Sequence, residues 1–245
     1  MCRLLYPFKN GRLMDYWQMV YTYFVDQGFP EALLDFVCIH QDEADQITTL
    51  IESKQPDSIL EIGTFIGLST GVLALASAPT STLVCVDPNF PVDIFSNNFK
   101  HPESRGCFEF VRTMLEHFGI HQKVVLLEGY FSCISVSYQE RFIAQGGNTD
   151  LIESNNITVV GERIGEYAPY DLVFVDGDHS LEFVYSDLSL VHRYLSEDGI
   201  IILHDLDPRG HWGKDVAAGV TQFLQNYAGF SIIIHENLGL LYKET

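Results

Sequence analysis

The feature that most constrains the fold is a series of short, almost continuously apolar runs separated by stretches with helical periodicity. Such runs are typical of strands that are buried on both faces of a sheet. Strands that alternate with helices form parallel βαβ units with helices on both sides. The sequence therefore predicts an α/β fold with three layers. The predicted strands are Ser58–Ile62, Thr82–Val86, Lys123–Leu127, Tyr170–Val175 and Gly199–Leu203.

The stretch between the fourth and fifth runs predicts one helix. Its apolar residues recur at spacings of three and four, which places them on a single helical face. We expect Gly199 to stop this helix, because glycine is common just beyond a helix end. The residues of this face are Leu181, Val184, Leu188, Val191 and Leu195.

The two ends of the chain differ from this alternating pattern. Ser231–His235 and Leu240–Lys243 are separated by a short turn, which predicts an antiparallel hairpin that closes the sheet. Residues 1–55 are mostly helical in pattern, and we expect them to form a cap before a main domain at 56–245. A polar stretch at about 131–169 predicts an insertion, either an ordered lid or a disordered loop.

Composition narrows the possible partners and the cellular location. The net charge of −19 over 245 residues disfavours binding to nucleic acid and to anionic membrane surfaces. The five cysteines are odd in number and include no CxxC pair, which favours a reducing compartment. No apolar stretch is long enough to span a membrane and no signal peptide is visible. We therefore expect a cytoplasmic protein.

The first predicted strand leads into a glycine-bearing loop, SILEIGTFIGLST. Gly63 permits a tight turn and Gly67 permits a close approach of backbone and ligand. The pattern is ExGxxxG rather than the dinucleotide pattern GxGxxG, and Phe65 would crowd a pyrophosphate. Glu61 would repel phosphate, but it suits a ligand with an ammonium group, such as the amino acid end of S-adenosylmethionine. Asp87 ends the second strand, where an acidic residue can accept the hydroxyls of a ribose.

The fourth run ends in DLVFVDGDHS, which has two interpretations. The triplet Asp176-Gly177-Asp178 could hold a metal ion for a nucleotide-sugar, as in a glycosyltransferase. Alternatively, it is one edge of an active site that does not involve sugars.

Four segments, SILEIGTFIGLST, LVCVDPN, YDLVFVDGDHS and GIIILHDLD, resemble in this order the class I S-adenosylmethionine-dependent methyltransferases. The resemblance is to the small-molecule O-methyltransferase-like branch, which includes catechol and macrocin O-methyltransferases. It implies a Rossmann-like fold whose mostly parallel, seven-stranded sheet has an antiparallel last strand. It also implies S-adenosylmethionine as cofactor and methylation of a hydroxyl on a small-molecule acceptor.

The resemblance further implies which residues bind the cofactor. The loop after the first strand would hold the methionine end, with Ser69 at its carboxylate, and Asp87 would bind the ribose. The third strand would be followed by residues that flank the adenine, although Tyr130 stands where many relatives have a small polar or acidic residue. The implied cofactor-binding residues are Glu61, Gly63, Thr64, Phe65, Gly67, Ser69, Asp87, Gly129 and Tyr130.

In metal-dependent relatives the aspartates that end the fourth and fifth strands bind a divalent cation. Asp176 and Asp205 match them, so Mg²⁺ or Ca²⁺ is the implied metal, acting on the acceptor hydroxyl. Leu206 departs from the pattern, because catechol-type relatives have an asparagine ligand there, and His204, Asp207 or water would have to complete the coordination. His179 stands where those relatives have a catalytic lysine. It could act as the base or merely cap the following helix.

Three hypotheses follow for the function. The first is methyl transfer to a small molecule, with Asp176 and His179 as catalytic residues. The second is a metal-dependent glycosyltransferase, and the third is a non-catalytic binding module on the same scaffold. A homodimer is a further expectation, because aromatic residues near the N-terminus could form the core, cover a pocket or make dimer contacts.

Overall fold

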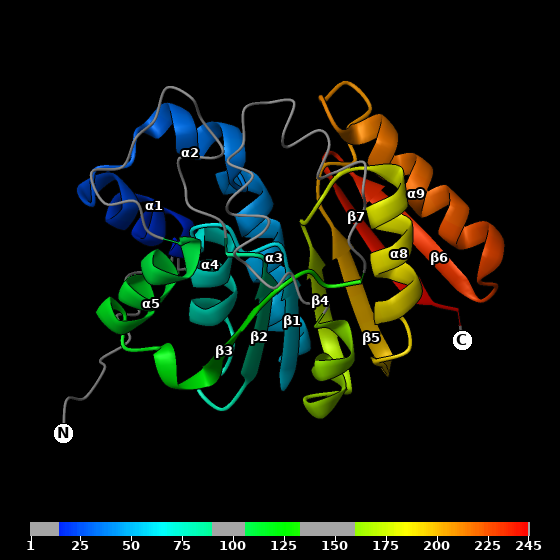
Figure 1. Ribbon diagram of the computed structural model, residues 1–245, viewed down its shortest axis with the longest axis horizontal. Coiled ribbons are helices and arrows are strands. Elements are labelled where there is room, and N and C mark those ends of the chain that lie inside the picture. The colour runs from blue at the N-terminus through cyan, green and yellow to red at the C-terminus, as the bar shows by residue number, and fades with distance from the viewer. Residues whose placement is uncertain (1–14, 90–105, 133–159, 245) are drawn as a thin grey trace.

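The computed structural model describes residues 15–89, 106–132 and 160–244, and these residues form three layers (Figure 1). A central sheet is covered by helices on both faces, as the apolar runs predict. The elements are α1 (Tyr16–Asp26), α2 (Glu31–Val37), α3 (Gln41–Lys54), β1 (Ser58–Ile62), α4 (Leu68–Ala76), β2 (Thr82–Asp87), α5 (Cys107–His117), η2 (His121–Lys123), β3 (Val124–Glu128), η3 (Gly161–Glu166), β4 (Tyr170–Val175), α8 (Leu181–Val191), β5 (Leu195–Leu203), α9 (Gly213–Asn226), β6 (Phe230–His235) and β7 (Leu238–Lys243).

The sheet has seven strands in the order β3-β2-β1-β4-β5-β7-β6. The first five are parallel, whereas β7 is antiparallel to both β5 and β6. This arrangement confirms the predicted mostly parallel sheet with an antiparallel last strand. In the register of the strands, Ile62 pairs with Val86 and Val175, and Val175 pairs with Leu203. The carboxyl ends of four strands therefore meet at one edge of the sheet.

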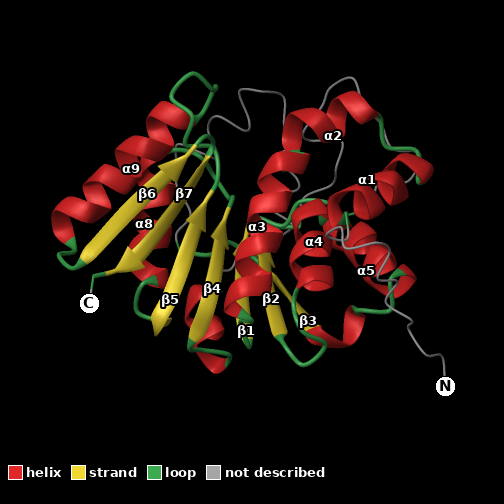
Figure 2. Ribbon diagram, turned by 180° about the vertical axis from the view of Figure 1, so that it is seen from behind, coloured by secondary structure: helices red, strands yellow, loops and turns green. Residues whose placement is uncertain are grey.

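The alternation of side chains along each strand creates two hydrophobic cores. Ile59, Leu83 and Phe174 face the helices α1 to α5, while Leu60 and Val173 face α8 and α9. Figures 1 and 2 show these two helical layers from opposite sides. Burial of each such side chain contributes about 1.5–3 kcal/mol, so both layers are firmly attached to the sheet.

The N-terminal helices belong to the first of these layers. A Cβ atom on Gly71 of α4 would lie 2.7 Å from the side chain of Val20, so α1 packs closely on α4. Tyr21 and Phe24 of α1 are core residues, which favours the core role among the three considered for the N-terminal aromatic residues. The division into a cap at 1–55 and a domain at 56–245 stays a prediction.

The helix expected to run as far as Leu195 is shorter than the sequence pattern predicts. α8 ends at Val191, and Leu195 begins β5, where it pairs with Tyr170. Gly199 lies within β5 and does not stop the helix. The register shifts between Tyr170 and Leu172, and a Cβ atom on Gly199 would lie 2.8 Å from the carbonyl oxygen of Tyr170. A larger residue at position 199 would collide with this part of the sheet. The helical spacing of apolar residues extends to Leu195 by coincidence, since Leu195 already belongs to the strand.

Most of the predicted insertion at 131–169 falls on residues 133–159, which lie outside the described residues. The choice between an ordered lid and a disordered loop therefore stays open. Within the described part of the chain, no helix combines the length and the apolar character needed to cross a membrane.

Candidate active site

The loops that follow β1 and β4 touch at the carboxyl edge of the sheet. The amide of Asp176 donates to the carbonyl of Ile62 at 2.8 Å, and the amide of Gly63 donates to the carbonyl of Val86 at 2.9 Å. Gly63 has a φ of 87°, and a Cβ atom there would lie only 2.0 Å from the carbonyl oxygen of Asp176. Glycine is required at this position both for its conformation and for the close approach of the two loops.

Glu61 is completely buried beneath the loop that follows β1. Its carboxylate accepts hydrogen bonds from the hydroxyls of Ser69 at 2.7 Å, Thr70 at 2.5 Å and Thr64 at 3.3 Å. Burial raises the pKa of Glu61 to about 7, although these hydroxyls oppose the shift. The carboxylate thus ties the loop to the first turn of α4. Its predicted contact with the cofactor ammonium, and that of Ser69 with the cofactor carboxylate, stay predictions.

Asp87 holds the same loop from the neighbouring strand. Its Oδ2 accepts the backbone amides of Thr64 at 3.0 Å and Phe65 at 2.9 Å, and its Oδ1 accepts the amide of Asn89 at 2.7 Å. Burial raises the pKa of Asp87, and the three amides oppose that shift. A carboxylate offers about four lone-pair directions, so acceptor capacity remains for a ribose hydroxyl. The predicted ribose contact is compatible with this geometry and stays a prediction.

The other predicted cofactor residues frame the same edge. Gly67 precedes α4 with a φ of 97°, and a Cβ atom there would lie 3.0 Å from the side chain of Val111 in α5. Gly129 follows β3, and its amide donates to the carbonyl of Asp87. Tyr130 is buried, with its ring 6.4 Å from that of Phe183. The adenine contact predicted for Gly129 and Tyr130 is untested.

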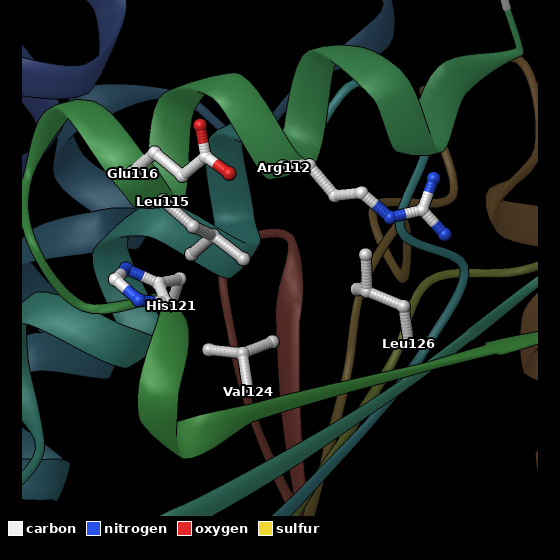
Figure 3. Close-up of a pocket in the computed structure, with 6 residues that line it drawn as sticks. All are labelled: Arg112, Leu115, Glu116, His121, Val124 and Leu126. Atoms are coloured by element: carbon white, nitrogen blue, oxygen red, sulfur yellow. The ribbon is translucent and has the colours of Figure 1, made fainter.

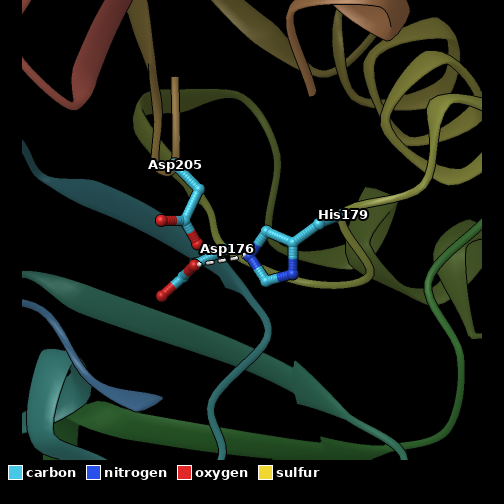
Figure 4. A group of neighbouring side chains, drawn as sticks. All are labelled: Asp176, His179 and Asp205. Atoms are coloured by element: carbon cyan, nitrogen blue, oxygen red, sulfur yellow. Dashed lines mark ion pairs between the residues drawn. The ribbon is translucent and has the colours of Figure 1, made fainter. Parts of the chain in front are cut away.

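Asp176, His179 and Asp205 come together at the ends of β4 and β5 (Figure 4). One potential ligand atom from each residue lies within 4.8 Å of the other two. Nε2 of His179 lies 2.8 Å from Oδ2 of Asp205 and 3.4 Å from Oδ1 of Asp176. Asp205 has a φ of 57°, a conformation that costs a non-glycine residue about 1 kcal/mol or more. The backbone is therefore strained at the residue whose carboxylate points into the cluster.

The cluster pairs carboxylates with imidazoles, and this sets its electrostatics. Burial alone would raise the pKa of Asp176, but His204 and His179 outweigh burial and lower it to about 2. Burial alone would lower the pKa of His179, but Asp176 and Asp205 raise it to about 9. The two aspartates are therefore ionised at neutral pH, and His179 carries a proton when no cation competes for them.

The side chains around His179 bear on its two predicted roles. Its ring stacks on Trp212 with centroids 5.4 Å apart, and the ring of His211 meets Trp212 edge-on. The side chain of Asp178, rather than that of His179, accepts the amide of Ser180 at the start of α8. His179 therefore faces the cluster instead of capping the helix, and Trp212 lies beside it.

Sequence reasoning missed two residues of this network and left a third undecided. His204 bridges Asp176 and Glu43, and Asn237 donates to Glu43 at 2.8 Å. Glu43 lies on the buried face of α3 together with Ile47 and Ile51. Glu43 stands four positions before Ile47 and eight before Ile51, so helical spacing places it on their apolar face. An acidic residue on such a face is a signal that could have identified Glu43. Asn237 lies in the hairpin turn, where polar residues are ordinary, so its sequence gave no such signal.

The cluster fits a divalent cation by its donor chemistry. Asp176 and Asp205 offer carboxylate oxygens, which are the ligands that Mg²⁺ and Ca²⁺ prefer, and His179 lies beside them. Nε2 of His179 is buried and is not aligned for a hydrogen bond, although two carboxylate oxygens lie nearby. Leu206 is buried and cannot replace the missing asparagine ligand. Asp207 is paired with Arg209 at 2.7 Å, which leaves water to complete the coordination.

A separate surface pocket of about 240 Å³ lies between α5, η2 and β3 (Figure 3). It is lined by Arg112, Leu115, Glu116, His121, Val124 and Leu126. None of these residues belongs to the strand-end cluster, so we assign the pocket no part in the site.

Comparison with protein families identifies one match. The model of a family described as a methyltransferase domain matches residues 60–206, which is more than half of the chain. This range contains the glycine-bearing loop, Asp87, the Asp176 strand end and Asp205. No curated protein matches the sequence.

Solved structures with a similar fold cover nearly the whole chain. A Podospora anserina methyltransferase, PaMTH1, bound to S-adenosylhomocysteine (SAH), has a TM-score of 0.62 at 14% identity, covering 95% of this chain and 89% of its own. An O-methyltransferase from Bacillus cereus in complex with SAH has a TM-score of 0.59 at 14% identity, with coverages of 99% and 94%. TomG, an O-methyltransferase of tomaymycin synthesis from Streptomyces achromogenes in complex with SAM, has a TM-score of 0.55 at 16% identity, with coverages of 96% and 92%.

Proposed function

We propose that this chain, which belongs to the family of methyltransferase domains, transfers the methyl group of S-adenosylmethionine to a hydroxyl of a small molecule. The observation that carries the proposal is the cluster of Asp176, His179 and Asp205 directly beside the loop after β1. A cofactor held by that loop would present its methyl group toward an acceptor in the cluster. Similar folds crystallised with SAH or SAM support this choice of cofactor.

The cofactor would lie across the ends of β1 and β2. The loop backbone and the start of α4 would lie beside the methionine end, and Asp87 would accept a ribose hydroxyl. The buried Glu61 would fix the shape of the loop through its three hydroxyl donors. Most of the rate enhancement would come from this positioning, because methyl transfer needs the acceptor oxygen in line with the bond that breaks.

In the proposed step, the acceptor oxygen forms a bond to the methyl carbon as the carbon–sulfur bond breaks. The electron pair of that bond stays on sulfur, which leaves S-adenosylhomocysteine. The hydroxyl proton passes to Nε2 of His179 when that nitrogen is unprotonated. Asp176 and Asp205 would hold Mg²⁺ or Ca²⁺. Such an ion, when bound, would lower the pKa of the acceptor hydroxyl.

The glycosyltransferase hypothesis finds less support in the two aspartates of the triplet. Oδ1 of Asp178 accepts the amide of Ser180, whereas Oδ1 of Asp176 faces His204, so the two carboxylates have different partners. The hypothesis of a non-catalytic module is distinguished from the proposal by turnover alone.

Calorimetric titration and product analysis test the proposal together. We expect heat of binding with S-adenosylmethionine and none with a sugar-nucleotide such as UDP-glucose. We also expect S-adenosylhomocysteine to form with some member of a panel of phenols, catechols and sugar hydroxyls, and to form faster when Mg²⁺ or Ca²⁺ is added after EDTA treatment. Binding of UDP-glucose alone would contradict the proposal, and cofactor binding without turnover would favour the non-catalytic module.

A further inference from the structure

Glu43, which lies well outside the strand-end motifs, is linked to Asp176 through one histidine. Oε2 of Glu43 lies 3.1 Å from Nε2 of His204, and Nδ1 of His204 lies 2.8 Å from Oδ1 of Asp176. Glu43 is 4% exposed and His204 is 7% exposed. Each ring nitrogen therefore faces a carboxylate oxygen, and Nδ2 of Asn237 lies 3.3 Å from Nε2. The ring is thus held at both ends.

Glu43 is itself fixed from two directions. Its Oε2 accepts the amide of His40 at 2.7 Å, and its Oε1 accepts Nδ2 of Asn237 at 2.8 Å. Asn237 also lies 3.3 Å from Oδ1 of Asp205, and its Oδ1 accepts the amide of Asp207 at 3.0 Å. The N-terminal layer and the β6–β7 turn therefore both reach the cluster.

Neither Glu43 nor Asn237 lies within residues 60–206, so the family match assigns them no role. Burial of the charged groups is costly unless each one is paired and hydrogen-bonded. Helix α3 buries a glutamate at a place where an apolar residue would fit its neighbours on the same face. Glu43 also caps the start of α3 by accepting the amide of His40, but that role does not require its further contact with His204.

We propose that Glu43 is a positioning residue of the reaction centre, acting through His204 to fix the carboxylate of Asp176. The inference rests on the proposed function, because it concerns the same strand-end cluster. Without Glu43, Nε2 of His204 keeps only its 3.3 Å contact with Nδ2 of Asn237, and the ring can turn about its side-chain bonds. Asp176 then loses the fixed donor that holds its Oδ1, and the cluster loses its geometry.

The position of Glu43 predicts which kinetic constant changes. Its contacts lead to Asp176 and Asp205, and none leads to the hydroxyls around Glu61 or to the loop amides bound by Asp87. Loss of residues that orient ligating or catalytic groups typically lowers activity about 10–100-fold. We therefore expect Glu43→Gln to lower kcat by about 10–100-fold while the KM for S-adenosylmethionine stays within twofold. A purely structural defect would weaken cofactor binding and turnover together.

The experiment compares Glu43→Gln with Asp42→Asn in the full chain. Asp42 is the preceding residue of α3 and is exposed, so its substitution removes the same charge without touching the network. Asn237→Ala is the second test variant, and it removes one of the two anchors of Glu43 in case Glu43→Gln does not fold. The assay is S-adenosylhomocysteine formation with the best acceptor of the phenol, catechol and sugar panel. Asp42→Asn should match the wild-type protein.

Nuclear magnetic resonance of ¹⁵N-histidine-labelled protein provides a readout that needs no acceptor. We expect the ring nitrogen signals of His204 to shift in Glu43→Gln and to stay unchanged in Asp42→Asn, because only the first substitution alters a side chain that lies 3.1 Å from Nε2. Ring nitrogen signals of His204 that do not change in Glu43→Gln would overturn the inference, as would an unchanged kcat in that variant. If the wild-type protein forms no S-adenosylhomocysteine, the proposed function fails, and the histidine signals alone then decide whether Glu43 fixes His204.

Discussion

Two buried groups of carboxylates lie at the same edge of the sheet, yet their surroundings are opposite. Glu61, at the end of β1, is surrounded by hydroxyls, and burial raises its pKa to about 7. Asp176, at the end of β4, is surrounded by imidazoles, which overcome the effect of burial and lower its pKa to about 2. The two groups meet where Gly63 contacts the carbonyl of Asp176.

The difference teaches what each group can do. Hydroxyls stabilise a carboxylate without adding charge, so the Glu61 group is suited to holding a loop in one shape. Imidazoles add charge and can release protons, so the Asp176 group can exchange a proton for another cation. One edge of the sheet thereby provides a rigid support for a cofactor beside a centre that can react.

Gly63→Ala tests the contact between the two groups, and we expect the largest effect from it. The new Cβ atom would lie 2.0 Å from a backbone oxygen that cannot move without shifting β4, and φ is also unfavourable. We expect a loss of more than about 4 kcal/mol in the free energy of unfolding, which is exceptional for one substitution. Urea denaturation measures it.

The matched control is Gly28→Ala, since Gly28 has a φ of 91° but no atom within 4 Å of the added Cβ. It isolates the cost of conformation, which we expect to be about 1–2 kcal/mol. Equal losses in the two variants would mean that the loops do not need their close contact.

Glu61→Gln tests whether the first group titrates as a buried, hydroxyl-bound acid. The pKa of Glu61 is about 7 in the folded protein, against an ordinary value of 4.5 when unfolded. A raised pKa stabilises the fold fully below pH 4.5, and this stability is lost as the pH rises through 7. The wild-type protein should therefore lose at most about 3 kcal/mol relative to Glu61→Gln over this range.

Denaturation curves at pH 4.5, 6 and 8 measure this difference, with Glu52→Gln on the exposed face of α3 as the control. The stability difference between the wild-type protein and Glu52→Gln should change little over the same range. A difference between the wild-type protein and Glu61→Gln that is constant with pH would show that Glu61 stays ionised throughout.

The two groups also differ in how far the sequence could predict them. Parallel strands place their carboxyl ends together, so the meeting of Asp176 and Asp205 follows from identifying two strands and the residue after each. The partners of Glu61 were visible as Thr64, Ser69 and Thr70, but their direction depends on how the loop turns into α4. The hydrogen bonds of Glu61 to its own loop and to α4 could therefore not be predicted from the sequence.

The contribution of Glu43 depends on tertiary packing alone. No local rule relates α3 to the end of β5, since their positions are set by how the N-terminal layer packs on the sheet. The sequence pattern likewise carried the predicted helix through Leu195, because apolar spacing does not reveal where a chain leaves a helix to pair with Tyr170.

Asp176→Asn tests the second group through its chemistry. The amide keeps the shape of the side chain but removes the charge that faces His204 and His179. We expect kcat to fall by about 100-fold or more, equivalent to about 2.7 kcal/mol in activation free energy. The assay is formation of S-adenosylhomocysteine. Asp178→Asn is the control, because its side-chain oxygen can still accept the amide of Ser180, and we expect nearly full activity.

The smallest effect we expect is stabilisation of the metal-free protein by Mg²⁺ or Ca²⁺. A cation that binds the folded state at ten times its Kd adds about 1.4 kcal/mol of stability, or about 3–5 °C in Tm for a chain of this size. Because a cation and the proton of His179 compete for the same two carboxylates, the gain should be larger at pH 8 than at pH 6. Asp205→Asn should lose this gain in Tm, because it removes one of the two carboxylates. Glu61→Gln should keep the gain, because Glu61 is bound by hydroxyls and does not belong to the cluster. A gain in Tm that survives in Asp205→Asn would place the cation elsewhere and remove the proposed distinction between the two groups.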